Sequence, residues 1–233
     1  YLHNNLLTGK LPADIDKLGN LEQLYVSYNQ LEGELPASFE KITPLTHLSL
    51  NNNQFSGAVP PFTSLPKLEY LTLAANSFIF SDLEVYHDDF EAKIKTYTYL
   101  NQAKVDIEEI WRVELGSNVV LTTGLYSPAN EYQWYKNDVA IAGATSKEHL
   151  IEKVTKDDFA RYHFVAVNPK VGKLELIRHF ITLAKGAGDN NFCINDSDAG
   201  IITIADLVPQ GSTIEWYLEE TGGDPLPSSY DIE

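Results

Sequence analysis

Residues 21–65 decide the fold, and they read LEQLYVSYNQLEGELPASFEKITPLTHLSLNNNQFSGAVPPFTSL. Apolar residues recur along this stretch with a period of 24, and an Asn, a Gly and a Pro keep register with them. The register marks are Asn5, Asn29 and Asn53, Gly9, Gly33 and Gly57, and Pro12, Pro36 and Pro60, with Asn76 following after 23 residues. Such self-similarity indicates a repeat protein, in which each repeat is one coil that forms a short strand and then turns sharply away from it.

Each mark has a physical role in such a coil. The leucines point inward, so neighbouring coils share the burial and no single repeat is stable alone. The Asn lies where the chain bends into the interior, and its side-chain amide can satisfy buried backbone groups of two coils. Gly supplies conformations closed to other residues, and Pro ends strand pairing where its missing N–H is harmless.

The pattern over residues 1–78 resembles the leucine-rich repeat. Its Leu/Phe-x-Gly-x-Leu/Val-Pro stretch, as at Leu31–Pro36, is similar to the subclass of plant receptor ectodomains and bacterial surface proteins. Residues 1–5 already read as the middle of a strand without a polar cap, so we expect further repeats upstream. Methionine is absent even at position 1, which also indicates a piece of a longer chain. Residues 79–104 are predicted to cap the solenoid and connect it onward.

A second domain is predicted at 105–185, where apolar residues alternate with a period of two and indicate half-buried strands. Residues 132–144 resemble strand C, a turn and strand C′ of an immunoglobulin-like β-sandwich, with Trp134 in the core. Residues 158–164 resemble its strand F, with Tyr162 as the corner tyrosine. Phe164 stands where that family has its second Cys, so Trp134 should pack on apolar side chains instead of a disulfide.

Residues 186–233 hold ten acidic residues and no Lys or Arg. Their pattern resembles the start of a further immunoglobulin-like module, as in giant surface adhesins of gliding, Bacteroidetes-type bacteria, and it is too short to be complete. That resemblance implies a disulfide partner for Cys193 beyond Glu233, and a free buried thiol is the alternative. Asn195–Gly200 carries alternating oxygen ligands but lacks the later Glu of a calcium loop, which favours a hydrated turn.

Charge and motifs exclude several classes of function. The formal net charge of −16 would repel nucleic acid and anionic lipid, and no apolar run is long enough to span a bilayer. The six histidines form no zinc motif, the single Cys has no evident base beside it, and neither a nucleophile elbow nor a phosphate loop occurs. We therefore predict no enzyme activity, no catalytic residues, no metal and no cofactor.

What remains as a candidate site is the exposed, concave face of the repeat sheet. Alignment on the Asn marks places side chains in columns that alternate with the buried leucines. The predicted ligand-binding residues are Gln23, Tyr25, Ser27, His47, Ser49, Asn51, Tyr70 and Thr72. At roughly 4.8 Å per coil, four strands give a strip about 15 Å wide, enough for part of a peptide or for one or two sugar rings. Solubilising residues on a spacer are the alternative interpretation.

These observations predict a multidomain, mainly β protein: a leucine-rich-repeat solenoid followed by one complete and one truncated immunoglobulin-like module. The predicted function is non-enzymatic recognition or adhesion at a cell surface or in the extracellular space. The concave repeat face would bind protein or carbohydrate, and the immunoglobulin-like modules would form a stalk. The alternatives are a non-catalytic region of a secreted multidomain enzyme or of a receptor-kinase ectodomain. A cytosolic interaction scaffold is disfavoured by the sandwich.

Overall fold

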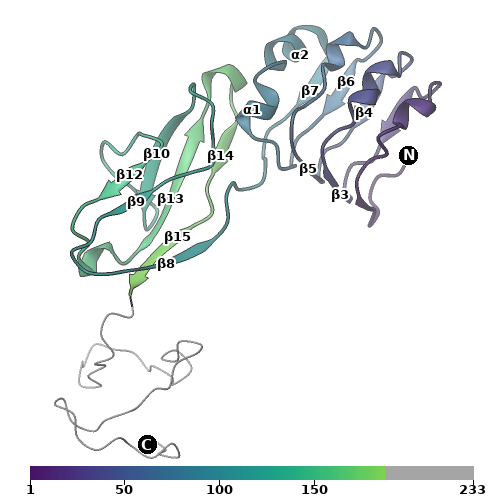
Figure 1. Ribbon diagram of the computed structural model, residues 1–233. Helices are drawn as coiled ribbons and strands as arrows, with labels where there is room; N and C mark the ends of the chain where they lie inside the picture. The colour runs from purple at the N-terminus through teal and green to yellow at the C-terminus, as the bar shows by residue number, and fades with distance from the viewer. Residues whose placement is uncertain (187–233) are drawn as a thin grey trace, which may run out of the picture. The chain divides into compact units, whose positions relative to one another are not determined.

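A computed structural model describes residues 1–186 of the chain, and Figure 1 shows the order of its elements. The predicted truncated module at 186–233, with Cys193 and Asn195–Gly200, lies outside the described residues apart from Gly186. Residues 1–186 form one compact unit, in which the repeats and the second β-region are in contact. The domain boundaries given above stay predictions.

The repeats form two parallel sheets joined by short 3₁₀ turns (Figure 1). The larger sheet contains, in order, β2 (Gln23–Tyr25), β4 (His47–Ser49), β6 (Tyr70–Thr72) and β7 (Thr96–Thr98). The smaller sheet contains β1 (Thr8–Gly9), β3 (Gln30–Gly33) and β5 (Gln54–Phe55). The turns are η1 (Ile15–Lys17), η2 (Ala37–Lys41) and η3 (Phe62–Ser64). The two coils that begin at β2 and β4 therefore each give one strand to each sheet and one turn, as the period predicts.

The asparagine marks form a hydrogen-bonded ladder through the interior. Asn53 donates from Nδ2 to the carbonyls of Val26 at 3.0 Å and Leu50 at 3.1 Å, and its Oδ1 accepts from the N–H of Leu31 at 3.0 Å. Asn29 and Asn76 repeat this arrangement one coil away on either side. The role expected of the asparagines is confirmed, because each amide satisfies backbone groups of its own coil and of the preceding one.

Left-handed backbone positions recur with the same period. Gly33 and Gly57 have φ of 79° and 80°, and a Cβ on Gly57 would lie 2.6 Å from Cγ of Glu34. The residue before each ladder amide is also left-handed, which includes Ala75 at φ 52°. The glycines therefore provide both a backbone conformation and a close approach that a side chain would prevent.

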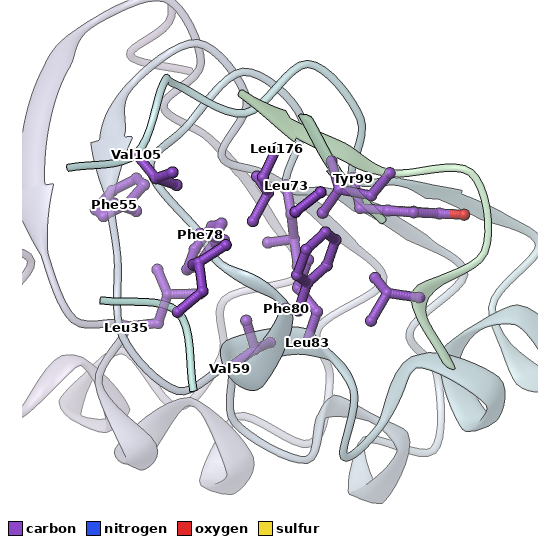
Figure 2. Packing of buried hydrophobic residues seen from close by; sticks show 14 of the residues in the cluster. Leu35, Phe55, Val59, Leu73, Phe78, Phe80, Leu83, Tyr99, Val105 and Leu176 are labelled. Carbon is purple, nitrogen blue, oxygen red and sulfur yellow. The ribbon is translucent and has the colours of Figure 1, made fainter. Parts of the chain in front are cut away.

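The last coil replaces its 3₁₀ turn by two helices, α1 (Phe80–Leu83) and α2 (His87–Lys93), before β7. Here Gln102 takes the place of the ladder asparagine: Oε1 accepts from the N–H of Phe78 at 3.1 Å, and Nε2 donates to the carbonyl of Leu73 at 3.0 Å. Figure 2 shows the apolar core continuing through this coil from Phe55 and Leu73 to Phe78, Phe80 and Leu83. Residues 79–104 therefore bury the open end of the repeats and also add a strand to their sheet.

The second β-region has a six-stranded sheet and a two-stranded one. The six-stranded sheet contains β8 (Glu109–Val113), β10 (Glu131–Lys136), β11 (Val139–Ala140), β13 (Arg161–Val167), β14 (Glu175–Ile177) and β15 (Ile181–Lys185). Its order is β11-β10-β13-β15-β8, with β14 also pairing with β13. β9 (Val119–Leu121) pairs with β12 (His149–Ile151), and the 3₁₀ turns are η4 (Lys156–Asp158) and η5 (Pro169–Val171). All these pairings are antiparallel except that of β15 with β8, which is parallel.

The core of this region is built around Trp134. Its ring meets the ring of Phe164 edge-on, with centroids 5.3 Å apart, and stacks on His149 of the smaller sheet at 6.2 Å. Tyr162 is buried and its hydroxyl donates to the carbonyl of Asp158 at 3.0 Å. The prediction that Trp134 packs on side chains in place of a disulfide is confirmed, and Tyr162 makes the backbone contact expected of a corner tyrosine.

A buried polar network joins the last coil to the second β-region. Glu84, just after α1, accepts through Oε2 from Ser127 Oγ at 2.7 Å and from Asn168 Nδ2 at 3.1 Å. Asn168 is fully buried and also donates to Oδ1 of Asn130 at 2.9 Å. The apolar core crosses the same junction, because Tyr99, Val105 and Leu176 belong to one buried cluster with Phe55 and Leu73 (Figure 2). The two regions are therefore held together by both apolar burial and satisfied hydrogen bonds.

Candidate binding face of the repeats

The predicted ligand-binding residues lie on β2, β4 and β6 and in the turns that follow β2 and β4. Strand register pairs Gln23 with His47 and then with Tyr70, and it pairs Tyr25 with Ser49 and then with Thr72. Between them runs a column of leucines, of which Leu48 and Leu71 are completely buried. The predicted columns are confirmed, since side chains in a strand alternate between the two faces of the sheet.

Four rings form a continuous stack on this face, which we call the aromatic row: Tyr1, Tyr25, His47 and Tyr70. Ring centroids are 4.8 Å apart from Tyr1 to Tyr25, 6.2 Å from Tyr25 to His47 and 5.5 Å from His47 to Tyr70. Successive ring planes differ by no more than 30°. Tyr25 and His47 are therefore each flanked by a ring on both faces, and they present mainly their edges to a ligand.

One hydrogen bond determines the tautomer of His47. The hydroxyl of Thr46 donates its only proton to the carbonyl of Glu22 at 2.8 Å. Its oxygen also lies 2.9 Å from Nδ1 of His47, so this nitrogen must donate to it. Neutral His47 therefore carries its proton on Nδ1, and Nε2 is the acceptor that has no partner within residues 1–186.

The polar atoms beside the row are held in place by neighbours. Tyr1 donates from its hydroxyl to Oε1 of Gln23 at 2.6 Å. Burial, followed by the nearby hydroxyls of Tyr1 and Tyr70, raises the pKa of Tyr25, so its phenol stays protonated and able to donate. At the other end Lys95 bonds Glu69 at 2.7 Å and lowers the pKa of that carboxyl. Thr46, Glu69 and Lys95 were not predicted, although Thr46 and Glu69 lie next to His47 and Tyr70 of the predicted columns.

The short polar residues of the columns differ from expectation. Ser27, Ser49 and Thr72 expose only 4% to 7% of their surface, so the prediction that they are open to a ligand is wrong for these three. Thr72 donates to Oδ1 of Asn51 at 2.8 Å, and Ser49 donates to the same oxygen at 3.1 Å. Their short side chains are covered because strands of the sheet lie about 4.8 Å apart and carry larger neighbours. The amide nitrogen of Asn51 makes no hydrogen bond within residues 1–186.

A second aromatic cluster, in the last coil, is structural. Tyr99 is buried, and its ring stacks on Tyr97 at 4.9 Å and meets His87 edge-on at 4.6 Å. Burial raises the pKa of both tyrosines and lowers that of His87. The cluster packs under the turn at Gly172, where a Cβ would come within 2.9 Å of the Tyr99 hydroxyl. These rings pack together at the end of the repeats.

Two further features bear on function within the described part of the chain. No group of three or more His, Cys, Asp or Glu side chains is arranged to hold a metal ion in residues 1–186. Among these same residues, none of the helices is both long and apolar enough to cross a bilayer.

Several solved structures are similar to this chain in part. A chain of the BIR3–SERK2 complex from Arabidopsis thaliana is 29% identical, over 40% of this chain and 51% of that one, with a TM-score of 0.33. The plant peptide hormone receptor RGFR1 in complex with RGF2 is 25% identical over 46% and 20%, with a TM-score of 0.35. The ectodomain of GASSHO1/SCHENGEN3 from Arabidopsis thaliana, in complex with Casparian strip integrity factor 2, is 26% identical over 46% and 13%, with a TM-score of 0.35. The chain thus spans about half or less of each of these proteins.

Family models match the same part of the sequence. The model described as Leucine Rich Repeat matches residues 20–42, and the one described as Leucine Rich repeats (2 copies) matches residues 45–87. No curated protein matches the chain. The matched segments contain the Asn ladder, the left-handed glycines and the strands β2 to β6 described above. The chain therefore contains leucine-rich repeats, at residues 20–42 and 45–87.

Proposed function

We propose that this chain is a non-enzymatic recognition or adhesion protein of the cell surface or extracellular space. In this proposal the repeats bind an extended segment of a partner protein along the aromatic row. The second β-region is an immunoglobulin-like domain that serves as a stalk. The chain contributes a preformed surface and no chemistry of its own.

The observation that carries the proposal is the stacking of the aromatic row. A sugar ring packs best over an open aromatic face, but the faces of Tyr25 and His47 are occupied by neighbouring rings. The edges of the rings remain for a ligand. They carry the tyrosine hydroxyls and Nε2 of His47, which can donate and accept hydrogen bonds. A peptide backbone offers both N–H and C=O groups along its length, so an extended peptide suits such an edge better than a stacked pyranose.

Rigidity of the row favours binding as well. Tyr25, His47 and Tyr70 lie on three adjacent strands whose backbones are paired, and Thr46 fixes the ring of His47. The side chains are therefore already ordered in the free protein, which lowers the entropy cost of forming a complex.

Three features support an immunoglobulin-like assignment for the second β-region. Tyr162 bonds back to the carbonyl of Asp158, as a corner tyrosine does. Trp134 packs on Phe164 at the centre of the core. A two-residue turn, at Asn137 and Asp138 with φ of 48° and 64°, joins β10 to β11. Positive φ at both central residues is typical of a tight β-hairpin of this kind.

The test is a selection of binders to the full chain from a library of random displayed peptides, beside an array of glycans. We expect peptides to be selected. The double variant Tyr25→Ala, Tyr70→Ala should weaken their binding by about ten-fold or more, because both rings that flank His47 are lost. Titration of a selected peptide by calorimetry gives the affinities.

Tyr126→Ala is the matched control, since Tyr126 is an exposed tyrosine of the second β-region. It should leave the affinity of the peptide unchanged. Binding that survives the double variant would refute the role of the aromatic row. Selective binding to glycans, lost in the same variant, would replace the peptide by a carbohydrate ligand.

A further inference from the structure

The outer face of the six-stranded sheet carries a second candidate surface, which goes beyond the proposed function. Trp134 and Phe164 point into the core. Their neighbours on the same strands, Tyr135 and His163, therefore lie on the opposite face of the sheet. Their rings are stacked with centroids 4.9 Å apart and planes 7° apart. Phe180 extends this platform and meets His163 edge-on at 5.2 Å.

Two cations converge on the same platform. Nζ of Lys104 lies 5.2 Å from the centroid of the Phe180 ring, and Cζ of Arg161 lies 4.6 Å from it. Both side chains belong to exposed residues, and neither forms an ion pair within residues 1–186. Each cation lies over the Phe180 ring, which attracts a positive charge without neutralising it. We call Lys104, Tyr135, Arg161, His163 and Phe180 the outer patch.

One nitrogen of the outer patch is buried without a hydrogen-bond partner. Nδ1 of His163 has none within residues 1–186, and its nearest carboxylate, Oδ1 of Asp138, is 3.7 Å away. Because buried polar atoms of folded proteins nearly always have partners, Nδ1 of His163 is open to a hydrogen bond with water or with a ligand. Asp138 is exposed in the hairpin turn, so the carboxylate nearest to this nitrogen stays in contact with solvent.

A hollow adjoins the outer patch and shares Lys104 with it. Its volume is about 380 Å³, and it lies between the last repeat coil and β14. Leu100 and Ile177 provide apolar walls, while Lys104 and Lys173 outnumber the single acid Glu175. A ligand that places a carboxylate against Lys104 can therefore place an apolar side chain in the hollow.

We propose that the outer patch and the adjoining hollow bind an acidic, extended segment of a partner protein that carries apolar side chains beside its carboxylates. The charge of the site fits this occupant, because the protein as a whole has a formal charge of −16 and would repel anions elsewhere. A positively charged site on an acidic protein attracts anionic ligands, and the apolar walls of the hollow favour those that also carry apolar groups.

The test measures binding of a short synthetic peptide of alternating Glu and Leu to the full chain by fluorescence polarisation at low salt. A peptide of the same length with Gln in place of Glu is the neutral comparison. We expect only the acidic peptide to bind, and Lys104→Glu and Arg161→Glu each to weaken it about ten-fold or more. Ile177→Ser should weaken the Glu and Leu peptide more than a Glu and Ser peptide, because it removes an apolar wall of the hollow.

Lys67→Glu is the matched control, since it makes the same charge change at an exposed lysine of the repeats. It should leave the affinity within about two-fold, and circular dichroism checks that every variant is folded. Absence of binding, equal binding of the neutral peptide, or an equal loss in Lys67→Glu would overturn the proposal. So would heparin that binds with the same dependence on Lys104 and Arg161, because the ligand would then be a glycan. Binding that persists in the Tyr25→Ala, Tyr70→Ala variant separates this site from the aromatic row.

Discussion

The repeats and the second β-region reach stability in different ways. In the repeats, interactions join residues about one period apart, as when Asn53 bonds the backbone of Leu31 and Val26. In the second β-region, β8 pairs with β15, so that Glu109 lies beside Ile181. Contacts between near neighbours can form and break coil by coil, whereas distant pairings form only when the whole second β-region does. The comparison therefore predicts graded local opening in the repeats and all-or-none opening in the second β-region.

The largest effect should come from breaking one rung of the ladder. Asn53→Ala leaves the N–H of Leu31 and the carbonyls of Val26 and Leu50 without their partner in the interior. We expect a loss of about 3 kcal/mol in the free energy of unfolding, because each unsatisfied buried group costs about 1–3 kcal/mol and part of the cost is relieved by relaxation. Urea unfolding followed by circular dichroism measures it.

Asn20→Ala is the control for this prediction, because Asn20 is an exposed residue of the repeats that makes no side-chain hydrogen bond within residues 1–186. It should change the unfolding free energy by less than about 0.5 kcal/mol. Hydrogen exchange should show the loss concentrated in the coils next to Asn53. Equal loss of protection at Trp134 and Phe164 would contradict the graded behaviour of the repeats.

A junction variant tests how far the two regions unfold together. Asn168→Ala removes the amide that reaches Glu84, Ser127 and Asn130, and leaves the Glu84 carboxylate with one donor fewer in a partly buried position. We expect the free energy of unfolding to fall by about 2 kcal/mol. The single thermal transition should split into two, as measured by calorimetry.

The matched control is Asn118→Ala, since Asn118 bonds only the backbone of Lys153, at 2.9 Å and away from the junction. It should lower the melting temperature slightly and leave one transition. Two transitions in the unmodified protein, or one in Asn168→Ala, would show that the network does not couple the regions.

The structural positions of the repeat residues could be predicted from the sequence because the marker residues recur with a fixed period. Asn29, Asn53 and Asn76 stand at the spacing that the ladder requires, and the columns of the sheet follow from them. The role of Gln102 was not predicted, because the last coil is longer and has a glutamine in place of the ladder asparagine. The burial of Ser49 and Thr72 was also not predicted. It depends on which neighbouring side chains cover them and not on the face of the sheet on which they lie.

The second β-region was predicted less completely for a related reason. Alternation of apolar residues locates strands such as β10 and β13, but it does not tell which strands pair. Glu84 and Asn168 are 84 residues apart, and no pattern links them. The outer patch likewise combines Lys104 from before β8 with Arg161 from β13, which only the folded chain brings to one ring.

The smallest effect should be a dependence of stability on pH that arises at His87. Burial lowers the pKa of His87 in the folded state, and the nearby carboxylates of Glu91 and Asp88 offset this only in part. In the unfolded chain the pKa is about 6.5, so below that pH the unfolded state binds more protons than the folded one. The contribution to stability is therefore fully present above pH of about 6.5 and is lost as the pH falls toward the lowered pKa.

We expect this loss to be about 1 kcal/mol or less, and His87→Phe to remove it while the aromatic contacts with Tyr97 and Tyr99 are kept. Urea midpoints at neutral and mildly acidic pH measure the difference. His149 and His163 have lowered pKa values for the same reason, so the second β-region should keep its own pH dependence in this variant. If His87→Phe kept the full pH dependence of the unmodified protein, His87 would not titrate differently in the folded and unfolded states, and the burial of its ring would not be the cause.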